Sequence, residues 1–230
     1  MLKGVIVAAA ACAAIPLILW SQTAGVSARD ALVDRLLFEV AHPIDLDAYP
    51  PDVRIELQRY LQRYAAYHSE RPRPMKLASE QGMVYSAWVA YERRLAAASP
   101  DPRAPTAAKG YVDRLRPCYE WEEFHDCPER EAIFATQYQT ANPDGPFKEY
   151  LPLLAAHLWL CAAEAYEYEN KPEEAAHSRR AYETMVSTAR QSKSLLIRLA
   201  AERLAERNSC WEPFAGNVGQ ALPPGNSGSF

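Results

Sequence analysis

From residue 29 onward, apolar residues recur three and four positions apart, in blocks separated by short segments rich in proline and polar residues. This spacing is typical of amphipathic α-helices, and we find no useful length of the two-residue alternation that marks strands. The predicted fold class is therefore all-α, as an antiparallel helical bundle or a short helical-repeat array. The predicted helices cover residues 29–41, 51–68, 77–98, 106–116, 128–141, 147–169, 172–190 and 194–207.

Prolines and serines mark several of the helix ends. Pro51 and Pro172 suit a first helical turn, where the backbone N–H that proline lacks would have no partner. Ser192 or Ser194 can accept a hydrogen bond from the first free N–H groups of the last predicted helix. We therefore expect that helix to begin directly after one of these two serines.

The distribution of proline and glycine suggests the domain organisation. Three prolines between residues 99 and 105 indicate a boundary between an N-terminal helical subdomain, 29–98, and a C-terminal one, 106–211. Glycine, proline, asparagine and serine are frequent in 212–230, which we expect to be a flexible tail.

The first 28 residues have the pattern of a signal peptide. Lys3 is the only charged residue before Arg29, an apolar run covers 5–20, and Val26-Ser27-Ala28 fits the small-residue rule for cleavage. We expect cleavage before Arg29 and a periplasmic or secreted protein. The alternative is an uncleaved anchor that leaves the rest of the chain facing the periplasm, although the apolar run is short for a spanning helix.

Composition excludes several classes of function. The chain carries a formal net charge of −4 and no run of basic residues, so we expect no nucleic-acid partner. No later segment is apolar for long enough to span a bilayer, so a membrane contact would depend on residues 1–28. The sequence contains no glycine-rich phosphate loop, no nucleophile elbow and no haem attachment motif, and we expect no cofactor.

Four cysteines follow the predicted signal segment, and an even number in an oxidising compartment predicts two disulfides. Three pairings of Cys118, Cys127, Cys161 and Cys210 are possible. We favour Cys118–Cys127, which closes a short segment without helical periodicity. We then expect Cys161–Cys210, because an up-down-up packing of the last three helices brings these residues together.

Residues 158–189 resemble a tetratricopeptide helical hairpin. Trp159, Ala163 and Tyr166 have the offsets of the first helix of such a repeat, and Ala175 has the offset of an alanine in the second. Arg179 and Tyr182 depart from the pattern, and no second copy is clear. The resemblance implies a helical scaffold that binds another protein or a peptide without chemistry of its own.

The sequence His125-Asp126-Cys127 resembles the active-site motif of secreted phospholipase A2. That resemblance implies His125 as general base and Asp126 as calcium ligand. The family's glycine-rich calcium loop is missing, and Pro128 stands where the family's helix must continue. The interpretation that we favour is a helix start at Pro128, with Asp126 and Glu129 forming a capping box.

A second group of polar residues lies on the helix predicted for 147–169. His157 and Cys161 are four positions apart and share a helix face, which Glu164 continues, while His177 is on the next helix. No close cysteine pair typical of zinc motifs is present, so we expect no metal and interpret His157 as an interhelical hydrogen-bond partner. The candidate binding residues are Trp121, His125, Asp126, His157 and Glu164.

The sequence alone leaves three functional hypotheses open. The first is an exported, non-enzymatic helical scaffold or binding module with a protein partner. The second is a small secreted hydrolase that uses His125 and Asp126 in the loop between Cys118 and Cys127. The third is a membrane-anchored accessory subunit of a larger complex, which requires that residues 1–28 are retained.

Overall fold

The computed structural model describes residues 28–38, 43–75, 80–118, 124–207 and 209–210, and this part of the chain is helical without a single strand. The all-α prediction is therefore confirmed. The predicted signal segment up to residue 27, Trp121 and the predicted tail lie outside the described residues. None of the described helices combines the length and the apolar character needed to cross a membrane.

The helices follow the predicted blocks closely. They are α1 (Ala28–Leu37), the short 3-10 helix η1 (Leu46–Ala48), α2 (Pro51–Ala66), α3 (Glu80–Ala98), α4 (Ala104–Leu115), α5 (Asp126–Ala141), α6 (Leu151–Tyr168), α7 (Pro172–Ala189) and α8 (Leu195–Glu206).

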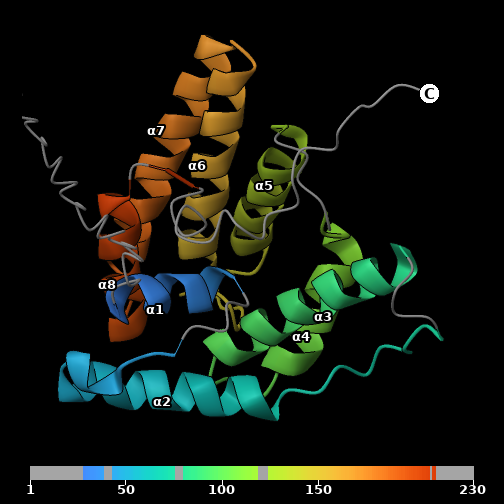
Figure 1. The fold of residues 1–230 in the computed structure, drawn as a ribbon, viewed down its shortest axis with the longest axis vertical. Coiled ribbons are helices and arrows are strands. Elements are labelled where there is room, and N and C mark those ends of the chain that lie inside the picture. Colours follow the sequence, from blue (N-terminus) through green and yellow to red (C-terminus); the bar gives the residue numbers. More distant parts are fainter. Residues whose placement is uncertain (1–27, 39–42, 76–79, 119–123, 208, 211–230) are drawn as a thin grey trace, which may run out of the picture.

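Helices α5, α6 and α7 stand side by side, and α6 is the central one (Figure 1). Nearly every residue of α6 is buried, as expected for a helix that is apolar on all sides. Helices α3 and α4 form a second pair, and α2 lies across the end of the molecule beside α3 and α8 (Figure 1). Helix α8 also packs against α1 and α7, so the two predicted subdomains share one apolar core.

Helices α4, α5 and α6 begin at other residues than predicted, and each has a proline in its first turn. Helix α4 begins at Ala104, two residues before the predicted start. Helix α6 begins at Leu151 rather than at residue 147, because a longer helix would require Pro152 to donate an N–H to residue 148. Helix α5 begins two residues before Pro128, which is possible because the first N–H groups of a helix need no intrahelical partner. The predicted capping box is wrong, since the residue at the cap position is His125 and its side chain makes no capping hydrogen bond.

The start of α8 agrees with the sequence. Ser194 is the N-cap, and its hydroxyl accepts a 3.3 Å hydrogen bond from the N–H of Ile197. Glu56 of α2 adds a second cap, because its carboxylate accepts hydrogen bonds from the Ser194 hydroxyl and from the N–H groups of Leu195 and Leu196. A carboxylate at this position is also favoured by the positive end of the helix dipole. Glu56 therefore fixes α2 against the start of α8.

Both predicted disulfides are present. Cys118 pairs with Cys127 at a Cα–Cα distance of 6.1 Å, and Cys161 pairs with Cys210 at 5.0 Å. The second bridge attaches the end of α8 to α6, across a sequence separation of 49 residues.

The segment that resembles a tetratricopeptide repeat forms the closely packed hairpin of α6 and α7. Trp159, Ala163, Tyr166 and Ala175, which carry the resemblance, are all buried. Membership of that family stays a prediction, because alanines at the crossing of any two antiparallel helices would be buried in the same way.

Candidate functional site

A groove of about 690 Å³ lies where five parts of the chain meet. One wall is the face of α2 that carries Glu56, Arg59 and Arg63. The others are the end of α3 with the linker 98–103, the turn 144–149 between α5 and α6, residues 193–197 at the start of α8, and Leu36 of α1. We call this site the groove. Its volume lies in the range of sites that hold a drug-sized ligand or a short peptide segment.

Proline-rich turns build two of these walls. Pro100 and Pro102 prevent α3 from continuing into α4, and Asp101 holds the resulting linker by accepting hydrogen bonds from the backbone and the guanidinium of Arg103. In the second turn, the N–H of Gly145 donates to the carbonyl of Asn142 at 2.9 Å. A side chain at residue 145 would bring its Cβ to 2.9 Å from that same carbonyl oxygen, so the turn requires glycine.

Arg63 attaches the α2 wall to the linker. Its Nε donates a 2.7 Å hydrogen bond to the carbonyl of Ala97, which lies in the last turn of α3. A cation near the C-terminal end of a helix is also favoured by the helix dipole. Burial lowers the pKa of the Arg63 guanidinium. We assign this side chain a role in holding the groove together.

The groove is lined by five cationic and four acidic residues, although the whole chain is negatively charged. The cations are Arg59, Arg63, Arg103, Lys148 and Lys193, and the acids are Glu56, Asp101, Asp144 and Glu149. Three of the acids are engaged within the protein. Glu56 and Glu149 accept hydrogen bonds around the start of α8, and Asp101 pairs with Arg103.

The cations on the rim are more open to a ligand. Arg59, Lys148 and Lys193 are exposed, and the ammonium group of Lys148 lies 3.7 Å from the exposed carboxylate of Asp144. Three of the four acids already accept hydrogen bonds within the protein, whereas Arg59, Lys148 and Lys193 are exposed. The rim of the groove therefore favours an acidic ligand.

A second cluster surrounds His125 at the start of α5. Its Nδ1 lies 2.6 Å from Oε1 of Glu169, its Nε2 lies 3.2 Å from Oδ1 of Asp126, and its ring stacks on Tyr166 at a centroid distance of 4.2 Å. Hydrogen bonds from Lys171 and His125 lower the pKa of the Glu169 carboxyl to about 2. Both ring nitrogens of His125 therefore face carboxylates, and the histidine ties α5 to the turn between α6 and α7.

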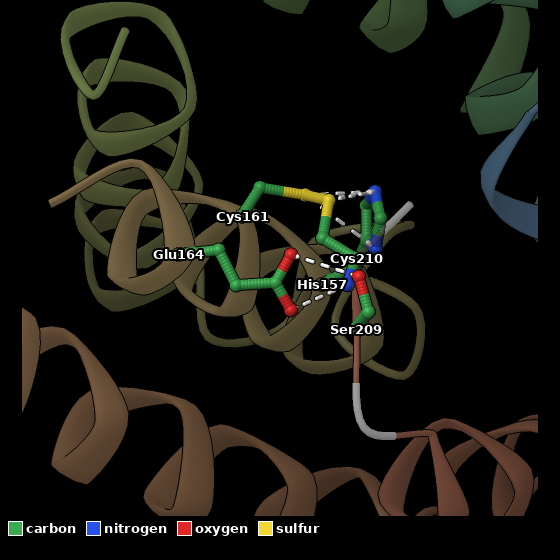
Figure 2. Close-up of a disulfide and its surroundings, with 5 residues drawn as sticks. All are labelled: His157, Cys161, Glu164, Ser209 and Cys210. Carbon is green, nitrogen blue, oxygen red and sulfur yellow. Dashed lines mark hydrogen bonds between the residues drawn. A yellow bond between two sulfur atoms is a disulfide. The ribbon is translucent and has the colours of Figure 1, made fainter. Parts of the chain in front are cut away.

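A third cluster is the Cys161–Cys210 disulfide with its neighbours (Figure 2). His157 lies beside both sulfurs, and its ring meets Phe38 edge to face at a centroid distance of 4.6 Å. Burial lowers the pKa of the His157 imidazole to about 3, so the ring is neutral at physiological pH. His157 was predicted to form an interhelical hydrogen bond, and that role stays a prediction; its ring lies beside the disulfide and against Phe38, which directly follows α1.

Glu164 holds Cys210 in place in this cluster. Its carboxylate accepts a 2.8 Å hydrogen bond from the N–H of Cys210 and a 3.0 Å bond from the hydroxyl of Ser209 (Figure 2). Burial raises the pKa of the Glu164 carboxyl. The chain segment after α8 is thereby fixed to α6 by the disulfide and by these two hydrogen bonds.

The structure thus divides the predicted binding residues into two places. His125 and Asp126 lie at the start of α5, whereas His157 and Glu164 flank the second disulfide. His177 contacts Trp159 instead of joining either group. The groove was not predicted from the sequence, although the two proline-rich turns that form two of its walls were both predicted as breaks between helices.

Comparison with known proteins gives no match: no family model, no curated protein and no solved structure matches this chain.

Proposed function

We propose that the protein is an exported, non-enzymatic binding module, and that its groove holds an extended acidic segment of a protein partner. The observation that carries the proposal is the groove itself, which is lined by exposed cations and by acids of which three accept hydrogen bonds within the protein. The size of the groove suits a few residues of an extended chain. The resemblance of the α6–α7 hairpin to a tetratricopeptide repeat points to the same class of function.

The export part of the proposal rests on the signal-like N-terminus and on the two disulfides. Disulfides persist in the periplasm and outside the cell, whereas thiols in the cytosol are kept reduced. Mass spectrometry of the protein isolated from its native cell tests this part. A mature chain that begins at Arg29 supports export with cleavage. A retained N-terminus instead favours the membrane-anchored accessory subunit.

Selection from a random-peptide display library tests the binding function. The proposal predicts that peptides rich in Asp and Glu are enriched, because exposed cations on the groove rim attract them. The double variant Lys148→Glu, Lys193→Glu should weaken their binding about tenfold, since each exposed ion pair is worth about 0.2–1 kcal/mol and reversal adds repulsion. Lys109→Glu on α4 is the matched control, because Lys109 is similarly exposed but lies outside the groove.

Two results would count against the binding function. One is a selection in which acidic peptides are not enriched. The other is a set of binders that lose affinity equally in the Lys109→Glu control and in the groove variant.

The hydrolase is the second candidate, and the His125–Glu169 pair is the observation that favours it, because a carboxylate on Nδ1 is how many catalytic histidines are oriented. Two contacts count against the hydrolase: Nε2 of His125 faces Asp126, and the ring stacks on Tyr166. These contacts give the histidine a structural role. His125→Ala should therefore leave selected-peptide binding unchanged. An ester- or phospholipid-hydrolysing activity that this variant abolishes, with helix content preserved, would favour the hydrolase instead.

A further inference from the structure

Three potential metal ligands meet at the second disulfide. His157 and Cys161 are four residues apart on α6, so both side chains lie on one face of that helix. Cys210 reaches the same face from beyond the end of α8 (Figure 2). The ligand atoms of these three buried residues all lie within 4.8 Å of one another.

The position of the imidazole fits a tetrahedral site. Zinc binds sulfur at about 2.3 Å and nitrogen at about 2.0–2.1 Å, so tetrahedral angles place a nitrogen and a sulfur about 3.6 Å apart and two sulfurs about 3.8 Å apart. His157 Nε2 lies 3.4 Å from Sγ of Cys161 and 4.0 Å from Sγ of Cys210. The nitrogen therefore lies at about the required distance from each sulfur. After the sulfur–sulfur bond opens, the two sulfurs must move apart to about 3.8 Å, which rotation of the Cys161 and Cys210 side chains can supply.

We propose that the chain binds one zinc ion through His157, Cys161 and Cys210 when this disulfide is reduced. A dithiol reductant attacks one sulfur through its thiolate and forms a mixed disulfide. Its second thiol then resolves the mixed disulfide, so the protein gains two thiols and the reductant leaves as a disulfide. Zinc binding releases the two thiol protons, because thiolates are the ligands.

The charge balance of this site suits its burial. Cys161, Cys210 and His157 are at most 2 % exposed, and an uncompensated charge at such a position is costly. Two thiolates, one neutral imidazole and one Zn²⁺ ion sum to zero charge. Two thiolates without the ion would leave two negative charges in the same place, so metal binding stabilises the deprotonated form.

Glu164 acts as a positioning residue in the proposed site. Its hydrogen bonds from the N–H of Cys210 and the hydroxyl of Ser209 involve no sulfur atom, so the reduced chain can retain them. They keep Cys210 close to α6 after the disulfide bond is reduced.

Three protein ligands leave the fourth tetrahedral position of the zinc ion for a water molecule. The inference does not depend on the groove or on its ligand.

Titration of the reduced and the oxidised protein with zinc, against a chromophoric chelator, tests the proposal. The reduced protein should bind one ion per chain tightly, and the oxidised protein should not. Cobalt in place of zinc should give thiolate-to-metal charge-transfer absorption and the intense visible bands of four-coordinate cobalt. Circular dichroism follows the helix content in parallel. If reduction unfolds the chain, zinc should restore the helix signal, because ligand binding favours the folded state.

Zinc titration of substituted proteins identifies the residues that bind the ion. Cys118→Ser, Cys127→Ser removes the other disulfide and should leave zinc binding intact. His157→Phe keeps a ring against Phe38 but removes the nitrogens, and should weaken binding at least about 100-fold, since loss even of outer-shell partners costs 10–100-fold. The proposal is overturned if zinc binding is lost in the Cys118→Ser, Cys127→Ser variant and retained in His157→Phe. Equal binding by the oxidised protein, or a reduced chain that neither binds zinc nor regains helix with it, also overturns it.

Discussion

Glu131 of α5 is a buried carboxyl group that should give the stability of the protein part of its pH dependence. It is 1 % exposed, and it accepts a 2.9 Å hydrogen bond from the N–H of Cys118. Burial raises the pKa of this carboxyl from its ordinary value of 4.5 to about 7. Between these values the folded protein keeps a proton that the unfolded chain has released. The stability present below pH 4.5 is therefore lost as the pH rises, by about 1.4 kcal/mol per pH unit.

The variant Glu131→Gln removes this titration and keeps the shape of the side chain. From about pH 5 to about pH 7, the free energy of unfolding of the natural protein should fall relative to that of the variant, by up to about 1.4 kcal/mol per unit. Urea denaturation at a series of pH values measures both curves. Parallel curves would show that Glu131 keeps its ordinary pKa in the folded protein.

Arg207 and Asp34 form a buried ion pair that joins the end of α8 to α1, at a distance of 2.7 Å. Their side chains are 7 % and 0 % exposed, so Arg207→Met deprives a buried carboxylate of its charged partner. We expect a loss of about 3–5 kcal/mol in the free energy of unfolding. The control Lys109→Met breaks the half-exposed pair with Asp113 and should cost at most about 1 kcal/mol. Similar losses in the two variants would show that burial of the Asp34 pair has no energetic consequence.

At the scale of secondary structure, the start of α8 depends on its caps. Ser194→Ala removes the hydroxyl that accepts from Ile197 N–H and donates to Glu56, and should cost about 1 kcal/mol. Thr188→Ala is the control, because Thr188 is exposed and its hydroxyl donates to the carbonyl of Thr184 within α7. The midpoint of urea unfolding measures both. An equal loss of stability in the two variants would show that the Ser194 cap does not stabilise the start of α8.

The same helix ends show what could be predicted from the sequence. Ser194 and Pro51 act within one turn of the chain, so the starts of α8 and α2 followed from local rules. The start of α6 could also be found locally, since Pro152 cannot supply the N–H that a longer helix needs. The pairing of His125 with Glu169 could not, because it depends on how α5 packs on the α6–α7 hairpin, across 44 residues of sequence.

For the whole molecule, the disulfides should differ in their contribution to stability. The Cys161–Cys210 bridge spans 49 residues and fixes α8 to α6, whereas Cys118–Cys127 spans nine. The chain-entropy model gives about 4 kcal/mol for the longer loop and about 2.5 kcal/mol for the shorter one. Paired Cys→Ala variants, compared by chemical denaturation in the absence of zinc, measure the difference. A larger loss from opening the short loop would contradict this order.

The groove is a property of the whole fold, because its walls come from α1, α2, the α3–α4 linker, the α5–α6 turn and the start of α8. These segments are far apart in sequence, and Glu56 and Arg63 hold α2 to two of the others. No local pattern could have indicated the groove as a unit. A ligand that binds there must therefore contact segments from both halves of the chain at once.

Hydrogen exchange of the protein with and without a selected acidic peptide tests this central claim most directly. The account predicts slower exchange in 98–103, 144–149 and 193–197 together, because these segments form the walls around the ligand. Exchange around His125 and at the α6–α7 turn should stay unchanged. Slower exchange confined to 124–131 and 166–171, with the groove segments unaffected, would contradict binding in the groove. It would place the binding site at the His125 cluster instead.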